Sequence, residues 1–154
     1  MAAEVMRRSA ADNRYFHPDF HGSLSAGLDF VAGRWGACAV REYLRRFALR
    51  YYAPLRAEIG QRGLAALRDW IERVYRDEGG TVDLALTDGR LEVRVPECPA
   101  VRHMRRSGYR VSDHFVETTT TVYEALCEGT PFDFTIEDYD SATGRAAFAF
   151  RRRP

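Results

Sequence analysis

Hydrophobic residues in the first half of the chain recur with the spacing of α-helices. Between residues 24 and 35, leucine, valine and tryptophan follow one another at intervals of three or four, which places them on one helix face. The same spacing continues over residues 40–51, 54–61 and 64–77, and glycine or proline separates several of these segments. Proline suits a first helical turn, and glycine ends a helix readily. We therefore expect four consecutive helices up to about residue 77.

Beyond residue 80 the pattern changes to an alternation of apolar and polar residues, which is typical of half-buried strands. Residues 82–87 and 91–95 alternate around Asp88-Gly89, a dipeptide that favours a tight hairpin turn. Residues 132–137 and 145–151 alternate in the same way around a second turn. The pattern predicts two β-hairpins.

Two further helices are predicted between the hairpins. The first begins near Pro99, turns Val101 and Met104 inward, and ends before Gly108. The second is expected from residue 112 to residue 127, with a serine as its cap, although its run of four threonines is a poor helix former.

Together these elements predict an α+β fold. The two hairpins can join into one four-stranded antiparallel sheet, packed with the N-terminal helical layer and the two further helices. Residues 1–14 are polar and are expected to form a flexible N-terminus, whereas residues 15–154 are expected to form a single domain. An exposed sheet face or helix face could pair with a second copy, so a homodimer is plausible.

The composition argues against several classes of function. The formal net charge of +1 is too balanced for a nucleic-acid face, and no apolar run approaches the roughly 20 residues that cross a bilayer. The start of the chain has no apolar signal region, and its three cysteines have no regular spacing, so we expect a cytoplasmic protein with reduced thiols. All 23 basic residues are arginines, which excludes Schiff-base chemistry on a lysine.

Cys98 is a candidate nucleophile. It precedes Pro99 at the junction of a predicted strand and helix, where unpaired N–H groups and the helix dipole lower a thiol pKa. A thiolate there could attack a substrate or bind a metal, and His103 follows after four residues. The alternative is that Cys98 is a small buried hydrophobic residue.

His114 and Glu117 are a candidate general base and its partner. They are three residues apart near the start of a predicted helix, so they can share a face. A carboxylate beside an imidazole fixes its tautomer and raises its basicity, which suits a general base or a metal ligand. The alternative is an ordinary surface pair.

Other residues could bind a divalent metal such as zinc. His17 and His21 have the i, i+4 spacing of many zinc sites, although Pro18 lies between them and both could instead pack a loop. Cys127 ends a predicted helix, where the dipole disfavours a free thiolate but not a metal-bound one. Three or four of these residues, with His103, could converge on one ion.

A basic cluster could hold a substrate carboxylate. Arg102 and Arg110, with Tyr109 beside them, are close in sequence to Cys98 and His114. Arginine binds carboxylates through two parallel hydrogen bonds. The alternative, which is common for runs of charge, is a solvated helix face.

The segment from Val95 to Phe134 resembles the family of L-2-amino-thiazoline-4-carboxylic acid hydrolases. The resemblance is carried by Cys98-Pro99, by the helix with His114 and Glu117, and by the sequence Gly129 to Asp133-Phe134. The segment is also similar to α+β ligand-binding domains of the 4-vinyl reductase type, which have a comparable order of helices and hairpins. The chain departs from the hydrolase pattern where the family has cysteines, since His114 and Phe132 occupy those places.

The resemblance implies hydrolytic opening of a cyclic, carboxylate-bearing small molecule at a C–N or C–S bond. In that hypothesis Cys98 is the nucleophile or a metal ligand, His114 is the base that Glu117 orients, and Arg102 or Arg110 holds the carboxylate. The alternative is a sensor or carrier domain without catalysis, which binds a small apolar molecule, a metal or a tetrapyrrole. Its pocket would use the aromatic residues of the helical half (Phe16, Phe20, Phe30, Trp35, Phe47, Tyr51 and Tyr52).

Overall fold

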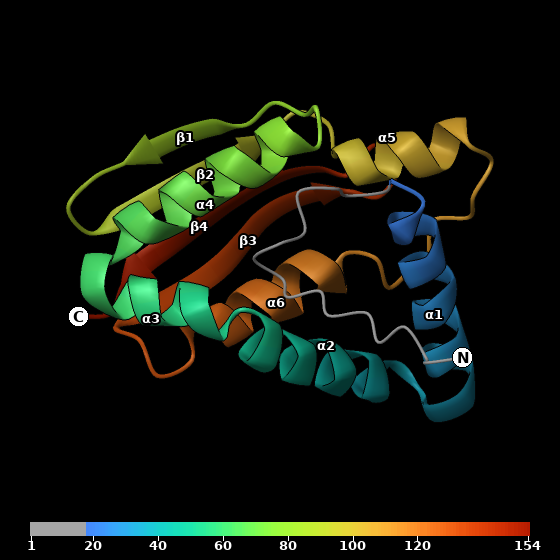
Figure 1. Ribbon diagram of the computed structural model, residues 1–154, viewed down its shortest axis with the longest axis horizontal. Helices are drawn as coiled ribbons and strands as arrows, with labels where there is room; N and C mark the ends of the chain where they lie inside the picture. The colour runs from blue at the N-terminus through green and yellow to red at the C-terminus, as the bar shows by residue number, and fades with distance from the viewer. Residues whose placement is uncertain (1–17) are drawn as a thin grey trace, which may run out of the picture.

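The computed structural model describes residues 18–154, which fold into one helical layer and one sheet (Figure 1). The predicted α+β fold is confirmed. In chain order the elements are α1 (Phe20–Trp35), α2 (Ala37–Tyr51), α3 (Ala53–Arg62), α4 (Leu64–Asp77), β1 (Asp83–Leu86), β2 (Arg90–Val95), α5 (Pro99–Arg106), α6 (Glu117–Cys127), β3 (Phe132–Asp140) and β4 (Arg145–Arg152).

The two hairpins join through their second strands. The sheet order is β1-β2-β4-β3, and every neighbouring pair is antiparallel. At the centre Leu91 lies opposite Phe150 and Val93 lies opposite Phe148, and none of the four is more than 1% exposed. The inner face of the sheet is thus apolar where β2 and β4 meet.

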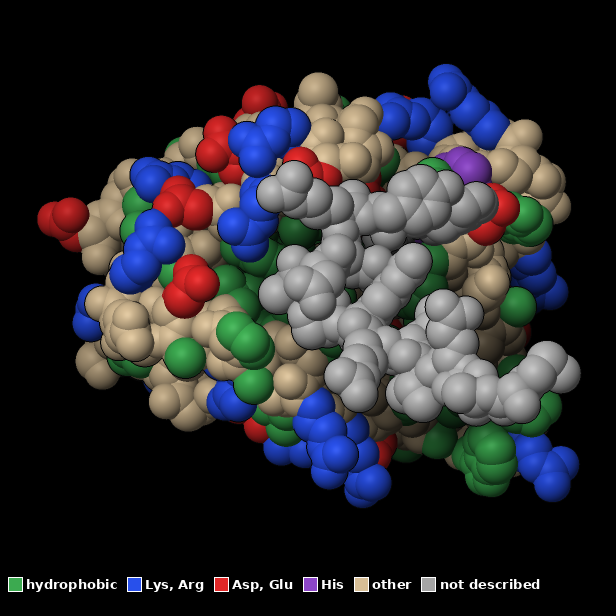
Figure 2. Space-filling model, viewed as in Figure 1, with side chains coloured by type: hydrophobic (Ala, Val, Ile, Leu, Met, Phe, Trp, Pro, Cys, Tyr) green, Lys and Arg blue, Asp and Glu red, His purple; other side chains and the backbone are tan. Residues whose placement is uncertain are grey.

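Helices cover this inner face. α4 packs on β1 and β2, whereas α6 packs on β3, and α2 packs on α6 (Figure 1). The opposite face of the sheet is charged: Arg90 and Arg151 both reach Glu137, at 3.0 and 3.1 Å. Charges of both signs are also mixed on the face that Figure 2 shows.

A β-bulge in β3 decides which residue enters the interior. The register of β3 against β4 shifts between Ile136 and Asp138, so that Tyr139 lies opposite the buried Ala146. Strict alternation from Ile136 would have put Asp138 on the inner face instead. The bulge therefore turns Tyr139 inward, as bulges beside functional sites often do.

The start of α6 differs from the sequence prediction. Residues 113–116 form turns, and the helix begins at Glu117 rather than near residue 112. The hydroxyl of Ser112 accepts a hydrogen bond from the His114 N–H at 3.1 Å, which stabilises this turn. The helix tolerates its threonines because the hydroxyls of Thr118 and Thr120 donate to backbone carbonyls one turn earlier.

Ser25 joins α1 to the segment before α6. Its side chain is fully buried, donates to the Arg110 carbonyl at 2.8 Å, and accepts from the Ser112 N–H at 2.8 Å. Replacement by alanine would leave the buried Ser112 N–H without this acceptor.

We expect Ser25→Ala to lower the free energy of unfolding by about 2 kcal/mol, because an unsatisfied buried amide loses its solvation. Urea unfolding measures the change. Ser23→Ala, on the exposed side of the same helix, is the matched control and should change stability by less than about 0.5 kcal/mol. Equal effects of the two substitutions would contradict the role of Ser25.

Candidate functional site

Cys98 lies at the N-terminus of α5, against the turn that joins β3 and β4. Its N–H donates to the Thr143 carbonyl at 3.1 Å, and its own carbonyl accepts from the Arg102 N–H at 2.9 Å. The predicted position at a strand–helix junction is therefore observed. The contact with Thr143, which is far away in sequence, fixes the Cys98 backbone at the end of the sheet where β3 turns into β4, and the residue is partly buried.

Burial determines the direction in which the pKa of the Cys98 thiol is shifted. It raises the pKa of Cys98 above its ordinary value, and the backbone N–H groups of Val101 and Ala100, which favour the thiolate, only partly compensate. The predicted lowering of the Cys98 pKa is therefore wrong, because loss of solvation outweighs the helix N-terminus.

Three tyrosines and one carboxylate lie close enough to act electrostatically on this thiol or on one another. We call Cys98, Tyr75, Glu78, Tyr123 and Tyr139 the Cys98 cluster. Burial is the main cause that raises the pKa of each tyrosine, to about 12 for Tyr139, and the cluster's acidic groups raise it further. All three phenols are therefore neutral hydrogen-bond donors at neutral pH.

The tyrosine hydroxyls of the Cys98 cluster make no hydrogen bond to any other described residue. Tyr123 is only 8% exposed. Their capacity to donate a hydrogen bond is therefore unused within the described residues.

An aromatic wall continues from the cluster toward α2. The ring of Tyr123 is 6.1 Å from that of Trp70, which is 5.3 Å from that of Tyr52, and successive planes are nearly perpendicular, at 87° and 74°. On the other side Tyr123 contacts Phe148 and Phe150 of the sheet at 5.1 and 5.4 Å. The wall thus joins the cluster to the core.

Four members of the cluster, Tyr75, Glu78, Tyr123 and Tyr139, were not identified from the sequence. Tyr75 and Glu78 close α4, and Tyr139 follows the bulge in β3. The one local signal was two consecutive acidic residues, Glu137 and Asp138, which interrupt the alternation and mark a bulge.

His114 and Glu117 do not form the predicted pair. His114 lies in the turn before α6, so the prediction that the two residues share a helix face is wrong. Among residues 18–154, no hydrogen bond or ion pair joins the two side chains. The Glu117 carboxylate instead accepts from the Thr121 hydroxyl at 2.5 Å and lies 3.8 Å from Arg41.

The candidate metal ligands do not converge within the described residues. His21 lies 3.4 Å from Glu78, and His103 lies 2.9 Å from Asp19. Cys127 is buried, and desolvation raises its pKa to about 12. No group of three or more potential ligands occurs in residues 18–154, and His17 lies outside them.

The basic cluster is divided between two places. Arg102 is near Cys98, where it donates to Glu97 at 3.1 Å and to the Gly79 carbonyl at 2.8 Å. Arg110 is exposed and pairs with Asp29 at 3.2 Å. The ring of Tyr109 packs on Gly22 of α1. Arg102 is therefore the member that remains beside the thiol.

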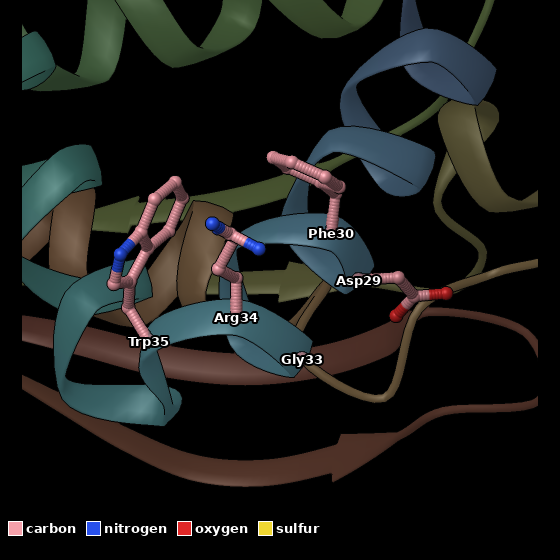
Figure 3. Close-up of a pocket in the computed structure, with 5 residues that line it drawn as sticks. All are labelled: Asp29, Phe30, Gly33, Arg34 and Trp35. Carbon is pink, nitrogen blue, oxygen red and sulfur yellow. The ribbon is translucent and has the colours of Figure 1, made fainter.

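A separate hollow of about 550 Å³ lies on the outside of α1. Phe30 and Trp35 flank Arg34 there, as Figure 3 shows, and Phe30 and Trp35 are more than 60% exposed, at 64% and 61%. Asp29 and Gly33 complete the lining. This hollow contains no member of the Cys98 cluster.

The raised pKa predicts how Cys98 reacts. Because only the thiolate attacks iodoacetamide, we expect Cys98 to be alkylated more slowly at pH 8 than the exposed Cys38, and faster as the pH rises above 9. Mass spectrometry of peptides after timed labelling measures both rates. Faster labelling of Cys98 at pH 8 would contradict the burial effect.

Comparison with known proteins assigns the chain to no family. No protein-family model matches the chain, and no curated protein matches it. No helix within residues 18–154 is both long and apolar enough to cross a membrane. The Cys98 cluster is therefore the part of the described structure that argues most directly for a function.

Proposed function

We propose that the protein is a small hydrolase that opens a cyclic, carboxylate-bearing molecule at a C–N or C–S bond, with Cys98 as the nucleophile. The observation that supports this most is the position of Cys98 at the N-terminus of α5, bonded to the β3–β4 turn, where the charges of Glu78 and Arg102 act on its thiol. The resemblance of the surrounding segment to thiazoline hydrolases supports the type of bond.

Because the free thiol is protonated, the reaction begins with proton transfer. In the proposed mechanism Glu78 takes the proton, directly or through a water, and the Cys98 sulfur attacks the ring carbon between nitrogen and sulfur. A new S–C bond forms while the ring C–S bond breaks, and a tyrosine of the cluster or the newly protonated Glu78 gives a proton to the departing sulfur. Water then cleaves the bond to Cys98, which releases the opened product and restores the thiol.

Arg102 is the proposed carboxylate anchor. Its guanidinium is half-buried beside Cys98, and its partners Glu97 and Gly79 fix its direction. Arg110, Tyr109, His114 and Glu117 are not carried into this mechanism, because the contacts described above place them on other partners. Glu78 replaces His114 as the base.

Turnover of a panel of substrates tests the proposal. Purified protein is incubated with 2-aminothiazoline-4-carboxylate, its oxygen analogue and the corresponding six-membered cyclic amidines, and release of free thiol or amine is followed. Ring opening that requires Cys98 supports the proposal. Absence of turnover across the panel, together with no covalent adduct on Cys98 by mass spectrometry, would refute it.

A binding domain without catalysis is the second candidate. The raised pKa of Cys98 favours it, because a neutral thiol is a poor nucleophile. Such a domain would be stabilised against heat by a ligand that remains unchanged after incubation. In either case a free thiol suits the predicted cytoplasmic location, and the predicted homodimer is tested by light scattering.

A further inference from the structure

We infer that the outward side of α1 is the surface through which the protein pairs with a second copy of itself, with the two α1 helices parallel and side by side. The inference does not depend on the proposed function, because α1 carries no member of the Cys98 cluster. It assigns a specific interface to the predicted homodimer, at the edge of the molecule where α1 stands (Figure 1).

The outward side of α1 differs from that of α4 in its lack of charge. On α4 every exposed residue is charged, as expected for a helix that faces solvent: Glu72, Arg73, Arg76 and Asp77. On α1 the one exposed charge is Arg34, and the other exposed residues are aromatic or small: Phe20, Ser23, Ala26, Gly27, Phe30, Gly33 and Trp35. Aromatic residues and arginine are enriched where proteins bind one another, and most other charges are depleted there.

Two glycines on this side are not required by the fold of one chain. Gly27 and Gly33 lie inside the helix, where glycine is less favourable than alanine, and neither has a positive φ. No described atom lies within 4 Å of where a β-carbon would stand on either residue, so packing within the chain does not demand them. Glycine suits a place where another backbone approaches closely. A second α1 helix would supply that backbone.

The hollow on the outside of α1 gives the second helix room to approach. It measures about 550 Å³, and the rings of Phe30 and Trp35 beside it are 5.9 Å apart at 84° (Figure 3). In a parallel pair Phe30 of the two copies meets at the centre, while the backbone of each copy enters the hollow over Gly33 of the other. Pairing removes from water a phenylalanine ring that is 64% exposed in one chain.

Asp29 and Arg34 are placed to pair between two parallel copies. They are five residues apart on opposite flanks of the row that Phe30 and Gly33 form. In two parallel helices packed through such a row, a residue on one flank lies beside the residue five positions later on the other helix. Each Asp29 would therefore meet Arg34 of the second copy, and the two-fold axis makes this contact twice. An antiparallel pair would instead bring like charges together.

Both side chains are available for this contact. Arg34 makes no ion pair with any described residue, and its guanidinium lies over the Trp35 ring at 5.7 Å. Asp29 is 32% exposed and its partner Arg110 is 74% exposed, so the existing pair is weak and open to a second cation. The charges of this helix are thus complementary to a parallel copy of the same helix.

Gly33→Gln tests the surface without damaging the fold. Glutamine favours a helix more than glycine does, so the variant should fold at least as well as a monomer, whereas its side chain fills the hollow and holds the helices apart. By sedimentation equilibrium of the full chain between about 1 and 200 µM, we expect the natural chain to form dimers and Gly33→Gln to weaken them at least about tenfold.

Gly60→Gln is the matched control. Gly60 is also exposed and helical, and no described atom lies within 4 Å of where its β-carbon would stand, so its replacement should leave dimerisation unchanged. Thermal melts at low concentration verify that both variants fold.

Oxidative cross-linking tests the direction of the pair. In a Cys38→Ala background, which removes the exposed native thiol, Ser23→Cys places a thiol two helical turns before Phe30 on the same side of α1. In a parallel pair these two thiols face each other, so diamide should join the chains through a disulfide. An antiparallel pair centred on Phe30 holds them several turns apart, beyond the reach of a disulfide.

Three results would overturn the inference. The first is a natural chain that stays monomeric up to about 200 µM, and the second is a dimer that Gly33→Gln does not weaken, or that Gly60→Gln weakens equally. The third is a dimer that Gly33→Gln weakens but that Ser23→Cys does not cross-link, which would exclude the parallel arrangement. None of these measurements uses ring opening, so the failure of the hydrolase and the failure of this interface are distinguished.

Discussion

Replacing Cys98 by alanine is expected to reduce ring-opening turnover at least about a thousandfold, which corresponds to about 4 kcal/mol of transition-state stabilisation. The sulfur forms the bond to the substrate in the proposed mechanism, and no other thiol lies in the Cys98 cluster. Steady-state kinetics with the best substrate of the panel measures the loss. Alanine keeps the β-carbon, so the contact with the β3–β4 turn remains.

The other two cysteines provide controls of opposite kinds. Cys38→Ala, at an exposed position, should change neither turnover nor stability. Cys127→Ala removes a buried sulfur and should lower stability by about 1 kcal/mol while turnover per folded molecule stays unchanged. If Cys98→Ala keeps full turnover, Cys98 is not the nucleophile. If it keeps only ligand binding and the natural chain has no turnover, the binding domain is the correct function.

The fold could be predicted from the sequence because its signals are local. The change from helical spacing to alternation near residue 80 separates the two layers, and Asp88-Gly89 marks the first hairpin. The start of α6 could not be predicted, because it depends on Ser112 being held by Ser25, a residue 87 positions earlier in the chain. Local helix signals cannot anticipate a tertiary hydrogen bond.

The candidate site could be predicted only in part, for a similar reason. Cys98 was identified because its position at a strand–helix junction is local. Glu78 and Tyr139 were missed, since their approach to Cys98 is produced by packing and by the bulge in β3. His114 and Glu117 had the right spacing for a pair, but the turn before α6 separates them. Spacing predicts a pair only where the helix has begun.

Gly144 is the position where a single methyl group should do the most damage to the fold. Its φ is +68°, and a β-carbon there would stand 2.4 Å from the β-carbon of Cys98 and 2.8 Å from a methyl of Val101. An L-residue strains this backbone conformation, and the collision forces α5 away from the β3–β4 turn. We expect Gly144→Ala to lower the free energy of unfolding by about 3–5 kcal/mol, measured by urea unfolding.

Gly79→Ala separates the effect of backbone strain from the effect of the collision with Cys98 and Val101. Gly79 has the same φ of +68°, but no described atom lies within 4 Å of where its methyl group would stand, so only the backbone strain of about 1 kcal/mol is expected. The difference between the two variants measures the contact between the β3–β4 turn and Cys98. If both variants lose the same stability, that contact does not hold the thiol in place. If Gly144→Ala alone is strongly destabilised, the close packing of the β3–β4 turn on Cys98 and Val101 accounts for the additional loss.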